Sequence, residues 1–145
     1  MELQIKTLCG KQYTGTNDDL SFTFCNSSQC CSTNGIQLTN GRQRSNGYVV
    51  DCNAPDTFGS SQIGDCKNFE FGSESIITGK VTLSNNDGFR GEWVKVKSSD
   101  GSFRQCNIDG WIDGNDDIPN ESNLPKYRDF YCSGLNYDHG KFKLH

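Results

Sequence analysis

The sequence predicts an all-β fold, an antiparallel β-sandwich that is stabilised by disulfides. Short runs of alternating apolar and polar residues recur along the 145 residues, and Gly, Asn, Asp and Ser separate them. Alternation with a period of two is typical of half-buried strands, and no stretch shows a sustained helical period. Eight cysteines in a chain of this length indicate a disulfide-stabilised domain.

The first strands are predicted before residue 26. Residues 2–8 and 20–25 alternate between apolar and polar side chains. From 26 to 66 the chain is rich in Asn, Ser, Thr and Gly, and within this stretch only residues 35–38 and 48–50 resemble short strands. We expect a loop-rich insertion pinned by disulfides, because its few apolar residues cannot offset the entropy lost when the backbone is ordered.

Strand signals return in the second half of the chain. The predicted strands are 68–71, 76–83, 92–97, 102–107, 127–132 and 141–144, and the last two are expected at the edge of the sheet. Ser99-Asp100-Gly101 is predicted as a hairpin turn, and residues 113–125 as an acidic, Asn-rich loop. The length favours a single domain, with the sandwich over 1–113 and a C-terminal extension, 114–145, packed on it.

The cysteines are expected to form up to four disulfides, which indicates a secreted, extracellular protein. A zinc site would need paired Cys-x-x-Cys motifs or Cys/His clusters, whereas the chain has no Cys-x-x-Cys and two histidines. The pairing cannot be deduced from the sequence, but the adjacent Cys30 and Cys31 are expected to reach different partners. The eight are Cys9, Cys25, Cys30, Cys31, Cys52, Cys66, Cys106 and Cys132. The chain starts directly with a predicted strand, so we expect a mature protein without a leader.

Charge and motifs argue against several classes of function. The net charge is −4 and no basic block occurs, so we expect no nucleic-acid partner. No apolar run approaches the roughly 20 residues of a transmembrane helix. The chain lacks a Gly-x-Ser-x-Gly elbow, His139 and His145 lie outside any motif, and Asp116 and Asp117 are adjacent in a polar loop. We therefore expect a protein that is not an enzyme.

Two polar turns supply the candidate metal site. One precedes the run 20–25 and the other follows the run 76–83. The candidate ligands are Gly15, Thr16, Asn17, Asp18, Asp19, Asn86, Asp87 and Gly88. Carboxylate, amide and carbonyl oxygens are the ligands that calcium takes, but Asp and Asn are also frequent turn formers. A calcium site is predicted if the two turns lie side by side.

Several landmarks occur in a characteristic order over about residues 2–113. They are Gly15-Thr16-Asn17-Asp18-Asp19, Gly64 leading to Phe69 and Phe71, Asn86-Asp87-Gly88 before Trp93, and Cys106-Asn107 followed by Trp111-Ile112-Asp113. This order resembles the PLAT domain, the β-sandwich module of lipases, lipoxygenases, bacterial phospholipase toxins and polycystins. Asn17 and Lys67 depart from the family pattern, which often has Asp at both positions.

The resemblance implies that the two turns lie at one end of the sandwich and bind calcium there. It also implies that Tyr13 and Phe89, which flank the turns, enter a lipid interface, where such rings are favoured. Arg90 would then meet anionic head groups. The alternative is that Phe89 folds back and covers the end of the core. Trp93 and Trp111 are assigned to the core or its rim.

The function expected first is that of a secreted, non-catalytic binding module, calcium-dependent, that contacts a lipid surface or a protein partner through these loops. The second is a carbohydrate-binding or toxin-like module whose glycan-binding or working surface is the cysteine-rich stretch 26–66. The third is a structural component of the extracellular matrix, which would associate with itself without a ligand.

Overall fold

Strands dominate the part of the chain that the structure describes. The computed structural model describes residues 1–70, 76–85, 87–98, 101–108, 110–113, 125–133 and 136–137. The strands are β1 (Glu2–Thr7), β2 (Leu20–Cys25), β3 (Cys30–Ser32), β4 (Asp56–Phe58), β5 (Ile76–Leu83), β6 (Gly91–Lys97), β7 (Ser102–Asn107), β8 (Tyr127–Ser133) and β9 (Asn136–Tyr137). Two short 3-10 helices, η1 (Ser60–Gln62) and η2 (Gly64–Asn68), lie between β4 and β5. The all-β prediction is confirmed.

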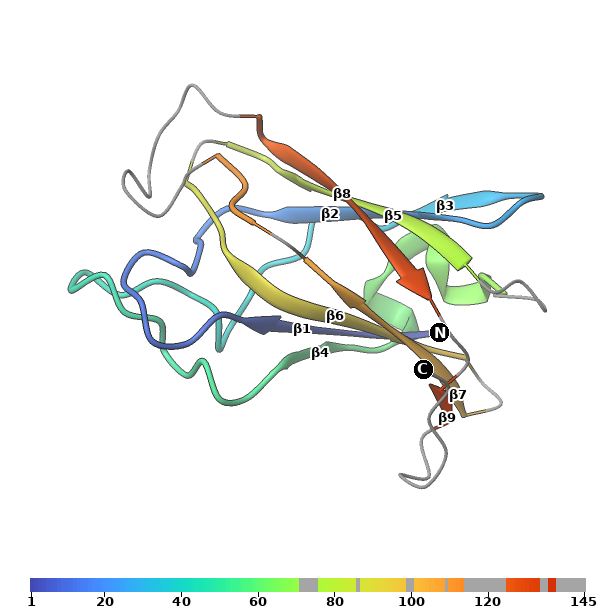
Figure 1. Cartoon of the computed structure of the whole chain (residues 1–145), viewed down its shortest axis with the longest axis horizontal. Coiled ribbons are helices and arrows are strands. Elements are labelled where there is room, and N and C mark those ends of the chain that lie inside the picture. Colours follow the sequence, from blue (N-terminus) through green and yellow to red (C-terminus); the bar gives the residue numbers. More distant parts are fainter. Residues whose placement is uncertain are drawn as a thin grey trace.

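The strands form one curled antiparallel sheet. Its order is β3-β2-β5-β8-β7-β6-β1-β4, and β9 pairs with β7. The prediction of an edge strand at 127–132 is therefore wrong, because β8 lies between β5 and β7. In Figure 1 the group that contains β2, β5 and β8 lies over the group that contains β1, β4 and β6. The two groups are joined where Cys106 of β7 pairs with Cys132 of β8. Hydrogen bonding is therefore continuous through the sheet, and a sandwich of two separate sheets is not shown.

The core lies between the two groups of strands. Alternate residues of β1 and β2 are buried, as the period of two requires. Phe22 and Phe24 of β2 stack at 5.9 Å between ring centroids, and Phe130 of β8 packs edge-on against both. In the other group, Ile5 of β1 and Val94 of β6 are fully buried. One apolar cluster thus holds the curled sheet closed.

Four disulfides use all eight cysteines. Cys9–Cys52, Cys25–Cys30, Cys31–Cys66 and Cys106–Cys132 are the pairs. The adjacent Cys30 and Cys31 do reach different partners, as predicted. Three of the bridges hold the stretch 26–66 to itself or to the sheet, which agrees with a disulfide-pinned insertion. A disulfide-rich chain of this kind fits an oxidising environment.

Some local predictions are wrong or lie outside the described residues. The strand expected at 68–71 is not formed over its described part, because η2 extends to Asn68 and Phe69 turns into the core with 5% exposure. The stretches 35–38 and 48–50 contribute isolated bridges, Leu20 with Ile36 and Gln43 with Val49. The predicted strand 141–144, most of the 113–125 loop, Asn86, Asp116 and both histidines fall outside the described residues.

Candidate functional site

The two acidic turns lie side by side. β2 and β5 are paired so that Leu20 lies opposite Leu83, and the turn at 15–19 therefore enters β2 where the turn at 84–90 leaves β5. The Ser84 amide donates to the Asp19 carbonyl at 3.0 Å, and the Asp19 amide donates to Ser84 Oγ at 3.0 Å. The prediction that the turns meet is confirmed, and its physical cause is the β2–β5 register.

Each turn uses a carboxylate to hold the backbone of the other. Asp18 Oδ2 accepts hydrogen bonds from the amides of Asn85 and Asp87, both at 3.1 Å. Asp87 Oδ2 accepts from the Asn17 amide at 2.8 Å, and Thr16 Oγ1 donates to the Asp87 carbonyl at 2.7 Å. Such side-chain to backbone bonds are what Asp and Thr favour in turns. These residues therefore have a structural role whether or not a cation is bound.

The paired turns also concentrate negative charge. Burial raises the pKa of Asp18 above its usual value, and the charges of Asp87 and Asp19 raise it further, against the lowering effect of the two amide hydrogen bonds. Within the described ranges the one ion pair is Lys6–Glu92, which involves none of these carboxylates. The end of the sheet thus carries carboxylates that no described side-chain cation neutralises.

The donor chemistry fits a hard cation only in part. Calcium takes roughly 6 to 8 oxygen ligands and accepts water among them. The hydrogen bonds described above occupy Oδ2 of Asp18 and of Asp87, which leaves Oδ1 of each as a possible ligand. No group of three or more His, Cys, Asp or Glu side chains with the arrangement of a metal site is formed by the described residues. Any calcium here would need carbonyl oxygens and water to complete its ligands.

A hairpin that the sequence analysis missed lies against the acidic turns, and we call residues 40–51 the basic hairpin. The Arg44 amide donates to the Tyr48 carbonyl at 2.8 Å, and the Val50 amide donates to the Arg42 carbonyl at 3.0 Å. Gly47 has φ +89°, which an L residue rarely adopts. The signal was the Asn46-Gly47 pair, a strong hairpin dipeptide, directly before the strand-like run at 48–50.

Several contacts fix the basic hairpin to the body of the protein. Asp56 is 6% exposed, and its two carboxylate oxygens accept hydrogen bonds from the three consecutive amides of residues 39–41, at 2.8, 2.8 and 2.9 Å. The Thr16 amide donates to the Gly41 carbonyl at 3.0 Å, and the Gln43 amide donates to Asn17 Oδ1 at 3.3 Å. The Cys9–Cys52 disulfide joins the end of the hairpin to the loop that follows β1.

The outward face of the basic hairpin combines positive charge with exposed rings. Because residues 42 and 50 are paired, and 44 and 48 likewise, alternation puts all four on the same face. Arg42 and Arg44 are exposed, Tyr48 is 51% exposed and Val50 is 40% exposed. Tyr13 lies next to them, since its amide donates to the Gly47 carbonyl at 2.6 Å. The loops 8–19 and 36–53 extend from the same end of the sheet, at the left of Figure 1.

The candidate contact residues differ in their exposure. Tyr13 is 36% exposed and has φ +67°, held in this conformation by its bond to the hairpin. Phe89 is fully buried and exchanges two backbone hydrogen bonds with Ile112, at 3.0 and 2.9 Å. Phe89 as a surface contact is therefore a wrong prediction, and the alternative that it covers the end of the core is correct. Arg90 is half-buried, and its guanidinium donates to the Ile108 carbonyl at 3.4 Å.

Comparison with known proteins does not assign the chain to a family. No protein-family model matches it, and no curated protein is similar to it in sequence. Within the described residues, no helix has both the length and the apolar character that crossing a membrane requires. Function must therefore be argued from the geometry of this chain alone.

Proposed function

We propose that this protein is a secreted, non-catalytic binding module that contacts anionic lipid surfaces through the outward face of the basic hairpin. The observation that carries the proposal is the grouping of Arg42, Arg44, Tyr48 and Val50 on one exposed face, beside Tyr13. Tyrosine rings are favoured at the boundary between water and lipid, and arginines pair with phosphate groups. A basic residue near an anionic membrane contributes about 1 kcal/mol, so the two arginines contribute about 2 kcal/mol together.

Calcium enters the proposal through the neighbouring acidic turns. Asp18, Asp19 and Asp87 lie beside the basic hairpin and would repel an anionic surface. A cation bound by their free oxygens would remove that repulsion, and binding to the membrane would then depend on calcium. The contact between the two turns agrees with the proposal that the chain is a PLAT-like domain.

Vesicle sedimentation tests the proposal. We expect the protein to sediment with vesicles that contain phosphatidylserine in the presence of millimolar calcium, and to remain in solution with phosphatidylcholine alone. Replacing both arginines, Arg42→Gln with Arg44→Gln, should weaken binding roughly thirtyfold, the equivalent of about 2 kcal/mol. Tyr131→Ala is the matched control, because Tyr131 is 69% exposed and lies on β8, away from the hairpin. Equal binding by the double variant and the parent protein would refute the assigned surface.

A separate variant tests the role of calcium. Asp87→Asn keeps an oxygen that can accept the Asn17 amide, and it removes one charge from the turns. Calcium should raise the melting temperature of the parent protein, and magnesium should raise it less. When free calcium is a hundredfold above its Kd, the gain in the free energy of unfolding is about 2.7 kcal/mol. Calcium-dependent stability and vesicle binding that persist unchanged in Asp87→Asn would exclude the acidic turns as the calcium site.

A further inference from the structure

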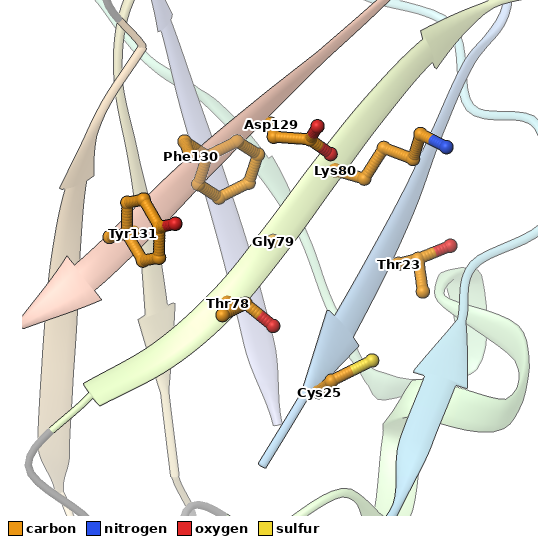
Figure 2. A pocket seen from close by; sticks show the side chains of 8 residues that line it. All are labelled: Thr23, Cys25, Thr78, Gly79, Lys80, Asp129, Phe130 and Tyr131. Carbon is orange, nitrogen blue, oxygen red and sulfur yellow. The ribbon is translucent and has the colours of Figure 1, made fainter.

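A second surface lies on the outer face of β2, β5 and β8, away from the basic hairpin. A shallow hollow of about 330 Å³ opens there between the three strands. Figure 2 shows the side chains that line it: Thr23 and Cys25 come from β2, Thr78 and Lys80 from β5, and Asp129 and Tyr131 from β8. Its volume is at the lower end of the range of about 300 to 1,000 Å³ that is usual for ligand pockets.

Core packing and a disulfide hold the strands that form the hollow. Gly79 lies opposite Phe130 in the β5–β8 register and has no side chain, so the Phe130 ring packs directly over it on the core side. Phe130 in turn packs against Phe22 and Phe24. On the β2 side, the Cys25–Cys30 disulfide joins the last residue of β2 to the first of β3. A ligand would therefore meet a preformed surface, with little entropy lost in ordering it.

The charges and polar groups of the hollow suit a neutral, polyhydroxylated ligand. Lys80 and Asp129 are direct cross-strand partners, so the face carries one charge of each sign. No ion pair joins them in the described structure, so the ammonium of Lys80 and the carboxylate of Asp129, both on exposed residues, can still hydrogen-bond to a ligand. The hydroxyls of Thr23 and Thr78 both donate and accept. A face with no net charge does not favour an anionic ligand, and one with so many polar groups does not favour a lipid chain.

Aromatic rings supply the apolar component that such a site needs. Tyr131 is 69% exposed at one wall of the hollow, and Tyr127, four residues earlier on the same face of β8, is 47% exposed. The two are roughly 14 Å apart along the strand, at about 3.4 Å per residue. Lys80 lies between them in the register, with its amine 4.4 Å from the centre of the Tyr127 ring. Sugar rings present C–H groups on one face and hydroxyls at the edge, which matches rings that flank hydrogen-bonding groups.

We infer that the outer face of β2, β5 and β8 is a binding site for a neutral oligosaccharide, with Tyr131 as the stacking residue and Asp129 and Lys80 as hydrogen-bonding partners of the sugar hydroxyls. The site differs from the stretch 26–66, where the sequence placed a glycan surface. It contains none of the acidic-turn residues, so sugar binding does not require calcium. It is also independent of the lipid contact proposed above.

A glycan array that includes neutral oligosaccharides, followed by titration calorimetry with the strongest binder, tests this inference. The protein is expected to bind a neutral glycan equally well with calcium and with a chelator. Tyr131→Ala should weaken that binding at least about tenfold, because it removes the ring on which the sugar stacks. Asp129→Asn should also weaken it. Because both side chains are exposed, neither change should alter the melting temperature or the circular dichroism spectrum.

Tyr48→Ala is the matched control, since it removes another exposed tyrosine, from the basic hairpin. It should leave glycan binding unchanged and weaken vesicle binding, whereas Tyr131→Ala should do the reverse. Absence of binding to every neutral glycan on the array would overturn the inference. Binding that Tyr131→Ala leaves intact, or binding confined to anionic glycans, would overturn it as well.

Discussion

The bridge between the two halves of the sheet allows a quantitative prediction. Cys106 and Cys132 are both fully buried, and their pair joins β7 to β8. We expect their joint replacement, Cys106→Ala with Cys132→Ala, to be the more destabilising of two disulfide deletions. The comparison is Cys25→Ala with Cys30→Ala, which removes a bridge of half-buried and exposed residues within one hairpin.

The expected losses follow from loop length and burial. The Cys106–Cys132 bridge closes a sequence separation of 26, and the Cys25–Cys30 bridge closes a separation of 5. Loop-closure entropy in the unfolded chain makes these worth about 3.5 and about 2 kcal/mol. Loss of two buried sulfur atoms adds about 1 kcal/mol each to the first variant. The total is about 5.5 kcal/mol, which is comparable with the whole stability of many domains of this size.

Guanidinium unfolding of the non-reduced proteins, followed by tryptophan fluorescence, measures both losses. The same concentration of sucrose in every sample keeps the weaker variant folded at zero denaturant, because excluded osmolytes favour the compact state. The reasoning is refuted if the two deletions cost the same free energy, or if the deletion of Cys25–Cys30 costs more. If the Cys106–Cys132 variant loses stability while β2 and β5 stay folded, the two halves of the sheet unfold independently of each other.

Three further predictions concern single side chains. Asp56→Ala should destabilise the protein by about 2 to 4 kcal/mol in urea, because the amides of 39–41 lose their acceptors. Gly79→Ala should cost about 1 to 3 kcal/mol, since the new methyl group meets the Phe130 ring. Asp18→Asn should gain stability over the parent as pH rises from about 3 to 7. The pKa of Asp18 is raised in the folded protein, so its carboxyl favours folding below its unfolded pKa and loses that contribution as pH rises through the folded value.

Each of these variants has its own control. Asp56→Asn retains one oxygen acceptor and should lose less stability than the alanine variant, and equal losses would show that the amides find other partners. Gly101→Ala is the control for Gly79, because no atom lies near its added methyl group and only its φ of +90° opposes it. For Asp18, the urea midpoints of the variant and the parent protein are measured at each pH. A difference between the midpoints that does not change with pH would contradict the prediction.

Much of the sheet was predictable because its signals are local. Apolar residues at every second position of β1 and β2 define the buried face, and these strands were predicted almost to the residue. The meeting of the two acidic turns was different. It depends on the pairing of Leu20 with Leu83, more than sixty positions apart, and only the family resemblance suggested it. The 68–71 prediction rested on the alternation of Phe69 and Phe71, and it failed over the described part, 68–70, because a buried aromatic such as Phe69 gives the same signal in a loop as in a strand.

The exposure of aromatic residues near turns was not predictable from their position. Tyr13 and Phe89 both flank the acidic turns, yet Phe89 is fully buried and Tyr13 is partly exposed. The difference arises because Phe89 pairs with Ile112, a residue in a separate loop.

The basic hairpin was missed for another reason. Its first half, residues 40–45, contains no apolar side chain, so the Asn-Gly turn and the strand-like run at 48–50 were the remaining signals.

The two proposed surfaces depend on different parts of the fold, which makes them separable. The basic hairpin is an insertion held by Asp56 and by the Cys9–Cys52 bridge, so its binding should weaken when either is removed and the variant is still folded. The hollow on β2, β5 and β8 is part of the sheet and rests on the packing of Phe130 behind Gly79. Damage to that packing should therefore reduce sugar binding and stability together. In a variant that lacks the Cys9–Cys52 bridge and is still folded, loss of lipid binding with retained sugar binding would fit both assignments, whereas loss of both would place the two activities on one surface.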